Sequence, residues 1–233
     1  MDEPASQRSD PTTIRRLYGR RQGHPLRVGQ AALLADLLPR IAVPAEGALD
    51  APTLFGDDRP LWLEIGFGRG EHMAAQAAAH PDVGLIGAEP FVDGVVGALM
   101  AVRDGNLSNV RIHHGDALNV LERLPPASLD RVFLLHPDPW PKARHAKRRF
   151  VNPGPIDLIA RALKPGGELR IGTDHPIYCR WTLMVMGQRR DFRWLAKTQA
   201  DFLQRPADWP PTRYEAKARR LGHEVWYFRW VRQ

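Results

Sequence analysis

The sequence contains a single cysteine, Cys179, in 233 residues. One thiol cannot form an intramolecular disulfide or supply a cysteine-based zinc site, so we expect neither disulfide nor metal. Chains without disulfides are typical of reducing compartments, which predicts a cytoplasmic location. No run of about 18 apolar residues occurs, which excludes a membrane-spanning helix. The segment from Met1 to Pro11 is polar and lacks the apolar stretch of a secretory signal.

Lysine is also scarce, because only five of the 33 basic residues are lysine and the other 28 are arginine. The net charge is +7, and arginine binds phosphate through two parallel hydrogen bonds. Apolar residues make up 43% of the chain, which is enough for a substantial core. The length suits one α/β domain with an arm. Nothing indicates an obligate protein partner, and monomer and homodimer both remain open.

The N-terminal part of the chain differs in composition from the rest. We expect a disordered tip over residues 1–13 and a basic arm with a short helix over residues 14–50. The helix is expected at about 30–38, ended by Pro39, and an α/β domain is expected over residues 51–233. The arm carries five arginines within thirteen residues, which favours a phosphate-binding strap over a solvated tail. These arginines are Arg15, Arg16, Arg20, Arg21 and Arg27.

From Pro60 onward, short apolar runs alternate with helix-like segments. This alternation predicts a mostly parallel, doubly wound sheet covered by helices on both faces. Ligands bind such sheets at the carboxyl ends of the strands. The expected strands are 61–65, 83–88, 110–113, 129–135, 168–172, 192–196 and 224–230; the expected helices are 73–79, 93–102, 117–123, 156–163 and 177–188.

Glycines and acids follow the first two expected strands. Gly66 and Gly68 form a turn that lets the backbone approach a ligand closely. The third small residue of a dinucleotide fingerprint would fall at Glu71, whose carboxylate would repel a pyrophosphate. A preceding acid, Glu64, suits the cationic end of a phosphate-free cofactor such as S-adenosylmethionine. Glu89 lies at the spacing of an acid that accepts from ribose hydroxyls.

Three further strand ends or helix starts carry polar residues. Asp116 is a candidate N-cap and equally a candidate acceptor for an adenine amino group. Asp174 follows the fifth strand, at the same edge as the other acids. Thr212 and Glu215 fit a capping box, which does not exclude a contact with substrate.

The fourth strand is followed by the most informative stretch of the chain, residues 136–150. Three prolines in five residues form a stiff bend that fixes Asp138 and Trp140. Five cations then follow without an intervening acid: Lys142, Arg144, Lys147, Arg148 and Arg149. A carboxylate and an aromatic ring beside a cationic cluster predict a site for a base on an anionic polymer.

The run from Pro137 to Lys142, with the basic residues after it, resembles the signature of the bacterial tRNA (guanine-N7-)-methyltransferases. The resemblance extends over about residues 14–233 and includes residues 20–23, 64–68, 87–89, 115–116, 172–174 and 212–215. Two positions differ from the usual pattern: His136 replaces an aromatic or apolar residue, and Arg213-Tyr214 replaces Lys-Phe.

The resemblance implies a Rossmann-like class I fold and methyl transfer from S-adenosylmethionine to a guanosine at position 46 of the tRNA variable loop. It implies a cofactor site formed by Glu64, Gly66, Gly68, Glu89, Asp116 and Asp138, with Asp138 also the active-site residue. It implies substrate contacts by Lys142, Asp174, Thr212, Arg213, Tyr214 and Glu215. We expect Arg20, Arg21, Arg144, Lys147, Arg148 and Arg149 to contact the RNA backbone.

Other functions remain as alternatives. A NAD-dependent dehydrogenase shares the fold class, but Glu71 and the glycine spacing disfavour it. A methyltransferase for another RNA, or for a small molecule or protein, shares the glycine turn, and the cationic stretch disfavours a non-RNA acceptor. A non-catalytic RNA-binding module would not need Glu64, Glu89 and Asp116 beside the glycines. Either Asp138 or Asp174 could read the N1–H and amino group of guanine.

Overall fold

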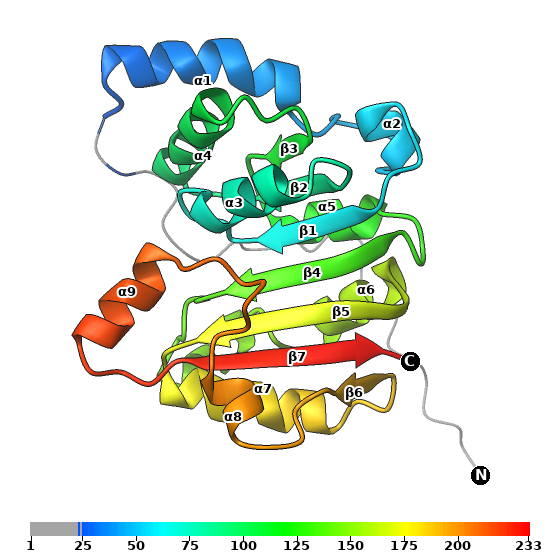
Figure 1. Cartoon of the computed structure of the whole chain (residues 1–233), viewed down its shortest axis with the longest axis vertical. Helices are drawn as coiled ribbons and strands as arrows, with labels where there is room; N and C mark the ends of the chain where they lie inside the picture. Colours follow the sequence, from blue (N-terminus) through cyan, green and yellow to red (C-terminus); the bar gives the residue numbers. More distant parts are fainter. Residues whose placement is uncertain (1–22, 24) are drawn as a thin grey trace.

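The computed structural model describes residue 23 and residues 25–233, so the expected tip and the arm arginines Arg15, Arg16, Arg20 and Arg21 lie outside the described residues. Within this part of the chain, the strands form one sheet in the order β3-β2-β1-β4-β5-β7-β6 (Figure 1). The strands β1 to β5 are parallel, and β7 runs antiparallel to both β5 and β6. Their bounds are β1 Leu61–Ile65, β2 Gly84–Ala88, β3 Val110–His113, β4 Leu129–Leu135, β5 Leu163–Thr173, β6 Phe192–Trp194 and β7 Trp226–Arg232.

Helices cover both faces of the sheet, as the alternating pattern predicts. In Figure 1, α3 and α4 lie in front of the sheet with α1 above them, and α5, α6 and α7 lie behind it. The bounds are α1 Val28–Ile41, α2 Ala51–Phe55, α3 Glu71–Ala79, α4 Val92–Asp104, α5 Ala117–Arg123, α6 Pro153–Ala162, α7 Pro176–Gly187, α8 Ala200–Leu203 and α9 Arg213–Arg220, with a 3₁₀ helix η1 at Ala143–Arg148. No helix in the described part of the chain is long and apolar enough to span a membrane.

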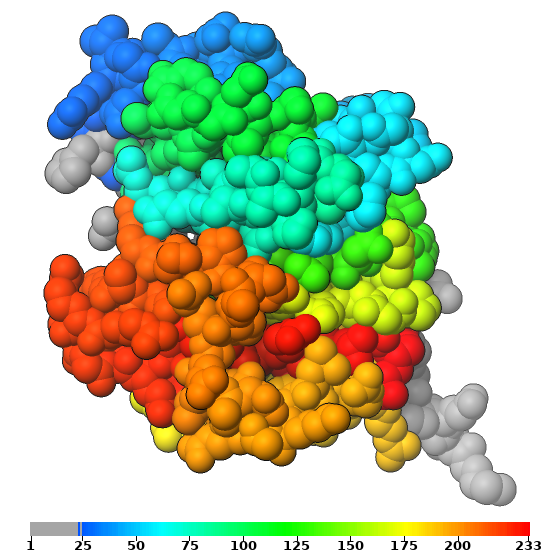
Figure 2. All heavy atoms as spheres, in the orientation of Figure 1, coloured from blue at the N-terminus to red at the C-terminus, as the bar shows by residue number. Residues whose placement is uncertain are grey.

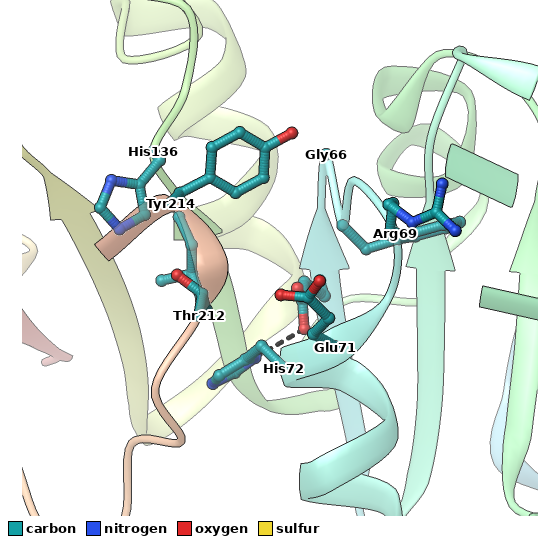
Figure 3. Close-up of a pocket in the computed structure, with 10 residues that line it drawn as sticks. Gly66, Arg69, Glu71, His72, His136, Thr212 and Tyr214 are labelled. Carbon is teal, nitrogen blue, oxygen red and sulfur yellow. Dashed lines mark hydrogen bonds and ion pairs between the residues drawn. The ribbon is translucent and has the colours of Figure 1, made fainter. Parts of the chain in front are cut away.

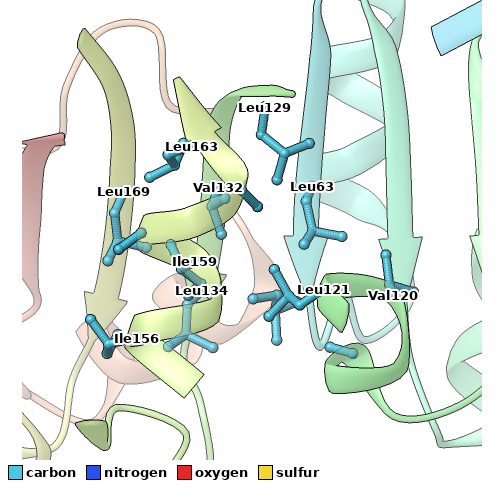
Figure 4. Packing of buried hydrophobic residues seen from close by; sticks show 14 of the residues in the cluster. Leu63, Val120, Leu121, Leu129, Val132, Leu134, Ile156, Ile159, Leu163 and Leu169 are labelled. Atoms are coloured by element: carbon cyan, nitrogen blue, oxygen red, sulfur yellow. The ribbon is translucent and has the colours of Figure 1, made fainter. Parts of the chain in front are cut away.

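The two faces of the sheet bury separate apolar clusters. Figure 4 shows the cluster beneath α5 and α6, where Leu63, Val132 and Leu169 of three adjacent strands meet the helices. All three side chains are fully buried. The opposite cluster lies beneath α1, α3 and α4 and includes Met73 and Leu99. Because both faces are covered, polar chemistry can occur at the carboxyl ends of the strands.

Several expected boundaries differ from the observed ones, two of them at proline or glycine residues. Pro39 does not end the first helix, because α1 continues to Ile41. The apolar face of α1 packs on the cluster beneath α4, and this packing outweighs the one hydrogen bond that proline removes in the last turn. The residues Lys164 to Gly167 were expected to separate a helix from a strand, but they lie inside β5. They coincide with a register shift between β4 and β5.

A long connection crosses the front of the sheet between β6 and β7. Residues 195–212, here named the crossing segment, contain α8 and lead into α9. In Figure 2 their orange atoms cover much of the lower sheet and lie against the teal atoms of α3. Gln76 of α3 donates to the backbone oxygen of Asp208, at 2.9 Å. The guanidinium of the buried Arg170 holds the Asp208 carboxylate at 2.8 Å. The sequence alone did not predict this segment.

Candidate active site

A cavity of about 460 Å³ lies at the carboxyl edge of β1, β2 and β4. Its volume is within the range of pockets that hold cofactors and drug-sized ligands, roughly 300–1,000 Å³. Five of the six predicted cofactor residues line it, namely Gly66, Gly68, Glu89, Asp116 and Asp138. Residues that follow four different strands therefore meet at one place, as the parallel topology predicts.

The turn after β1 is shaped for a close approach of ligand to backbone. Gly66 and Gly68 have φ values of 68° and 56°, a region that disfavours other residues. A Cβ at Gly68 would lie 3.3 Å from the ring of Tyr214. Glu89 fixes this turn, because its two carboxylate oxygens accept from the N–H groups of Gly68 (2.8 Å) and Phe91 (3.0 Å). Burial raises the pKa of Glu89 above its ordinary value.

Asp116 caps α5, as one of its two expected roles requires. Its Oδ1 accepts from the N–H of Leu118 at 3.0 Å. The residue also lines the cavity, so capping and a ligand contact are compatible.

The loop after β4 is held in a strained conformation. His136 and Trp140 have φ values of 48° and 43°, which cost roughly 1–3 kcal/mol each for residues other than glycine. Arg149 offsets this cost, because its guanidinium donates to the backbone oxygens of Pro139 (3.1 Å) and Trp140 (3.0 Å). The loop presents Asp138, which is exposed, to the cavity.

The burial of Arg149 does not favour its expected contact with an RNA backbone. Only 5% of the residue is exposed, and its guanidinium also lies over the ring of Trp181. A side chain held in this way shapes the loop from within, so we assign it no contact with an RNA backbone. Lys142, Arg144 and Lys147 are exposed, and Arg148 lies over the ring of Trp140. The pKa of the neighbouring His145 is lowered by partial desolvation and by the charges of Arg148, Arg144 and Lys142.

Asp174 lies beside the cavity between two histidines. Its Oδ1 is 3.3 Å from His136 Nδ1, and its Oδ2 is 3.5 Å from His223 Nδ1. The hydrogen bond from His136 is the main cause that lowers the pKa of Asp174 to about 2. His136 in turn stacks on Tyr214, with ring centroids 6.1 Å apart.

Replacing Asp174 with asparagine is expected to make the free energy of unfolding less dependent on pH under acidic conditions. A lowered pKa means that the carboxylate stabilises the fold above its ordinary pKa of 3.8, and that this contribution is lost as the pH falls toward 2. The difference in free energy of unfolding between wild type and Asp174→Asn should be constant above about pH 5 and shrink on acidification. Urea titrations at a series of pH values measure it, and a difference independent of pH would contradict the assignment.

The start of α9 meets the site from the crossing segment. Thr212 caps the helix by accepting from the N–H of Glu215 at 3.1 Å, which confirms half of the capping box. Tyr214 lines the cavity and is 44% exposed. Glu215 is buried, and its carboxylate accepts from Arg219 at 2.9 Å, so we assign it no substrate contact. The backbone N–H of Arg213 donates to the carboxylate of Glu71 at 3.0 Å.

Glu64 lies in a second, much smaller cavity of about 20 Å³. This cavity adjoins the larger one, since Gly66, Leu135, His136 and Tyr214 line both. Figure 3 shows Thr212 and Tyr214 approaching it from one side and Glu71 and His72 from the other. The dashed line there marks a 2.7 Å contact from His72 Nδ1 to Glu64 Oε2.

The sheet order, the reversed β7 and the site at the carboxyl edge define a class I methyltransferase of Rossmann-like architecture. Two solved structures share this fold at low sequence identity. One is an rRNA methylase from Streptococcus thermophilus, with a TM-score of 0.51 and 13% identity over 76% of this chain and 88% of that one. The other is TrmN from Thermus thermophilus, with a TM-score of 0.52 and 16% identity over 88% of this chain and 48% of that one.

Sequence comparisons identify the family. A family model described as "Putative methyltransferase" matches residues 58–228. A tRNA (guanine-N(7)-)-methyltransferase from Zymomonas mobilis is 66% identical over 96% of each chain. One from Sphingopyxis alaskensis is 64% identical over 96% of this chain and 97% of its own. The chain belongs to the family of the tRNA (guanine-N7-)-methyltransferases.

Proposed function

We infer that the protein transfers a methyl group from S-adenosylmethionine to N7 of a guanine in tRNA, and that this guanine is at position 46 of the variable loop. The observation that carries this inference is the 66% identity, over nearly the whole of both chains, to a relative named for that reaction. A tRNA substrate also fits a cytoplasmic location.

The residues at the larger cavity fit the cofactor. Glu89, Asp116 and Asp138 contribute acceptors, which suit ribose hydroxyls, an amino group and a sulfonium centre. The positive φ of Gly66 and Gly68 opens the backbone at this point. We assign the cationic end to the side of Glu64 and the ribose to Glu89.

Bound S-adenosylmethionine supplies an electrophilic methyl group: guanine N7 attacks it with its lone pair, the C–N bond forms as the C–S bond breaks, and the sulfur leaves as a neutral thioether. Guanine N7 carries no proton, so no residue acts as a general base. Catalysis then consists of positioning and of stabilising the positive charge as it moves to the base.

Asp138 is the residue we place at the reacting atoms. It lines the cavity, and the loop that carries it is held rigid by Arg149. A rigid carboxylate stabilises developing positive charge without reorganising.

The RNA-binding surface is assigned to the exposed cations after Asp138 and to Tyr214. Replacing Lys142, Arg144 and Lys147 together with alanine is expected to weaken tRNA binding and to reduce its salt slope, d log K/d log [salt], by about 2 to 3. Filter binding at several salt concentrations measures this slope.

Arg190 provides the matched control for charge removal. It lies between α7 and β6, at the opposite edge of the sheet from the cavity. Arg190→Ala should leave the slope unchanged. A triple variant with the wild-type slope would remove the three cations from the RNA site.

The function is tested by incubating the protein with unmodified tRNA and methyl-labelled S-adenosylmethionine, digesting the RNA and identifying the labelled nucleoside. Label in 7-methylguanosine is expected, and a tRNA with adenine at position 46 should accept none. Label in another nucleoside would keep the cofactor and overturn the guanine assignment. Absence of label with bound cofactor would favour another RNA or a non-RNA acceptor.

A further inference from the structure

A buried row of polar side chains runs from the smaller cavity to the crossing segment. Glu64, His72 and Gln76 are 3%, 2% and 1% exposed. His72 Nδ1 lies 2.7 Å from Glu64 Oε2, and Gln76 Nε2 lies 3.3 Å from His72 Nε2. Gln76 Nε2 also donates to the backbone oxygen of Asp208 at 2.9 Å. Neither His72 nor Gln76 was a candidate from the sequence.

The direction of each hydrogen bond follows from the last one. A backbone carbonyl can only accept, so the amide of Gln76 must turn its Nε2 toward Asp208. The second hydrogen on Nε2 then points to His72 Nε2, which must accept. The imidazole therefore carries its hydrogen on Nδ1 and donates it to Glu64. One orientation of Glu64 is selected by this arrangement, with Oε2 engaged and the carboxylate at the wall of the smaller cavity.

The far end of the row lies on the crossing segment. Asp208 precedes Thr212 and Tyr214 by only a few residues, and both of these line the smaller cavity. In a second contact between the same two segments, the backbone N–H of Arg213 donates to the Glu71 carboxylate. The helix α3 is thus tied to the start of α9 through its first residue, Glu71, and to the crossing segment through Gln76.

We propose that His72 and Gln76 are positioning residues, which orient Glu64 toward the cofactor and couple it to the segment that carries Thr212 and Tyr214. This rests on the proposed function for the identity of the two ligands. His72 acts through Glu64, and Gln76 acts through the backbone of Asp208.

Three substitutions separate the two links. His72→Phe keeps the ring shape and removes both hydrogen bonds. His72→Asn places an amide N–H near the position of Nδ1, so it keeps the link to Glu64 and loses the link to Gln76. Gln76→Leu removes both hydrogen bonds of Gln76, to His72 and to Asp208, and leaves the contact between His72 and Glu64. His80→Phe is the matched control, because His80 ends the same helix and packs edge-on against Trp62.

Calorimetric titration with S-adenosylmethionine and steady-state kinetics with tRNA measure the outcome, and thermal melts confirm folding. His72→Phe should weaken cofactor binding roughly tenfold, as expected for a lost hydrogen bond to a buried charge. His72→Asn should recover most of that affinity. Both His72→Asn and Gln76→Leu should raise KM for tRNA about fivefold, with kcat and cofactor affinity near wild type; this factor is a coupling of about 1 kcal/mol.

Two results would overturn the proposal: a His72→Asn variant that binds the cofactor no better than His72→Phe, or a Gln76→Leu variant with the wild-type KM for tRNA. Cofactor titration needs no tRNA, so it tests the link to Glu64 even if wild type fails to methylate tRNA. That failure would count against the proposed function alone.

Discussion

Replacing Asp138 with alanine is expected to lower kcat by about a thousandfold, the upper range for removing one preorganised electrostatic group at a reacting centre. The carboxylate is presented to the cavity by a strained loop. Arg149 holds the backbone of this loop, so the position of the carboxylate is fixed. Because the positive charge moves from the sulfonium to the base, a carboxylate beside the base stabilises the transition state more than the ground state. Single-turnover methylation of tRNA at saturating cofactor isolates the chemical step.

The tRNA dissociation constant of Asp138→Ala should stay within about threefold of wild type, since the cations that follow carry most of the RNA affinity. Asp104→Ala, a surface change at the end of α4, serves as control and should keep full activity. A near-normal single-turnover rate for Asp138→Ala would show that Asp138 is not at the reacting atoms.

Replacing Glu89 with glutamine is expected to weaken S-adenosylmethionine binding by about 100-fold. Both oxygens of Glu89 accept backbone N–H groups, whereas a glutamine amide offers only one acceptor and would direct its NH₂ at the other N–H. The glycine turn then loses its support as well as an acceptor for the ribose. The loss corresponds to about 2.7 kcal/mol, within the range for hydrogen bonds to a charged group.

The pH dependence of cofactor binding gives an independent check on Glu89. Burial raises the pKa of this carboxyl above its ordinary value of 4.5, so it takes up a proton sooner on acidification than an exposed glutamate. In wild type, cofactor affinity should decline while the pH is still above 4.5, and the decline should be absent in Glu89→Gln. Calorimetry over this pH range measures both, and identical profiles would contradict the role.

The strands were predictable because their signal is local. Apolar runs at 61–65, 110–113 and 129–135 match β1, β3 and β4 residue for residue. Element ends were harder where packing overrides propensity, as at Pro39 in α1, and where the ladder is irregular, as at residues 164–167 of β5, which have no partner in β4. Proline and glycine mark breaks only when no buried face compensates.

The site was predictable to the extent that its residues follow strand ends. The topology itself brings Gly66, Glu89, Asp116 and Asp138 together. Arg149 could not be distinguished from its cationic neighbours, because its burial depends on the carbonyl groups of a loop shaped by three prolines. The contact of Gln76 with Asp208 joins residues 132 positions apart, and no periodicity records such a pairing.

The position of β7 has a consequence for how the chain is made. It is the last of the seven strands to leave the ribosome, yet it lies between β5 and β6 in the sheet. Until it emerges, β6 has no neighbour, and the edge of β5 is an open row of peptide groups on which other chains could pair. Synthesis that stalls before Trp226 would therefore release a chain with an exposed strand edge, which is prone to aggregate.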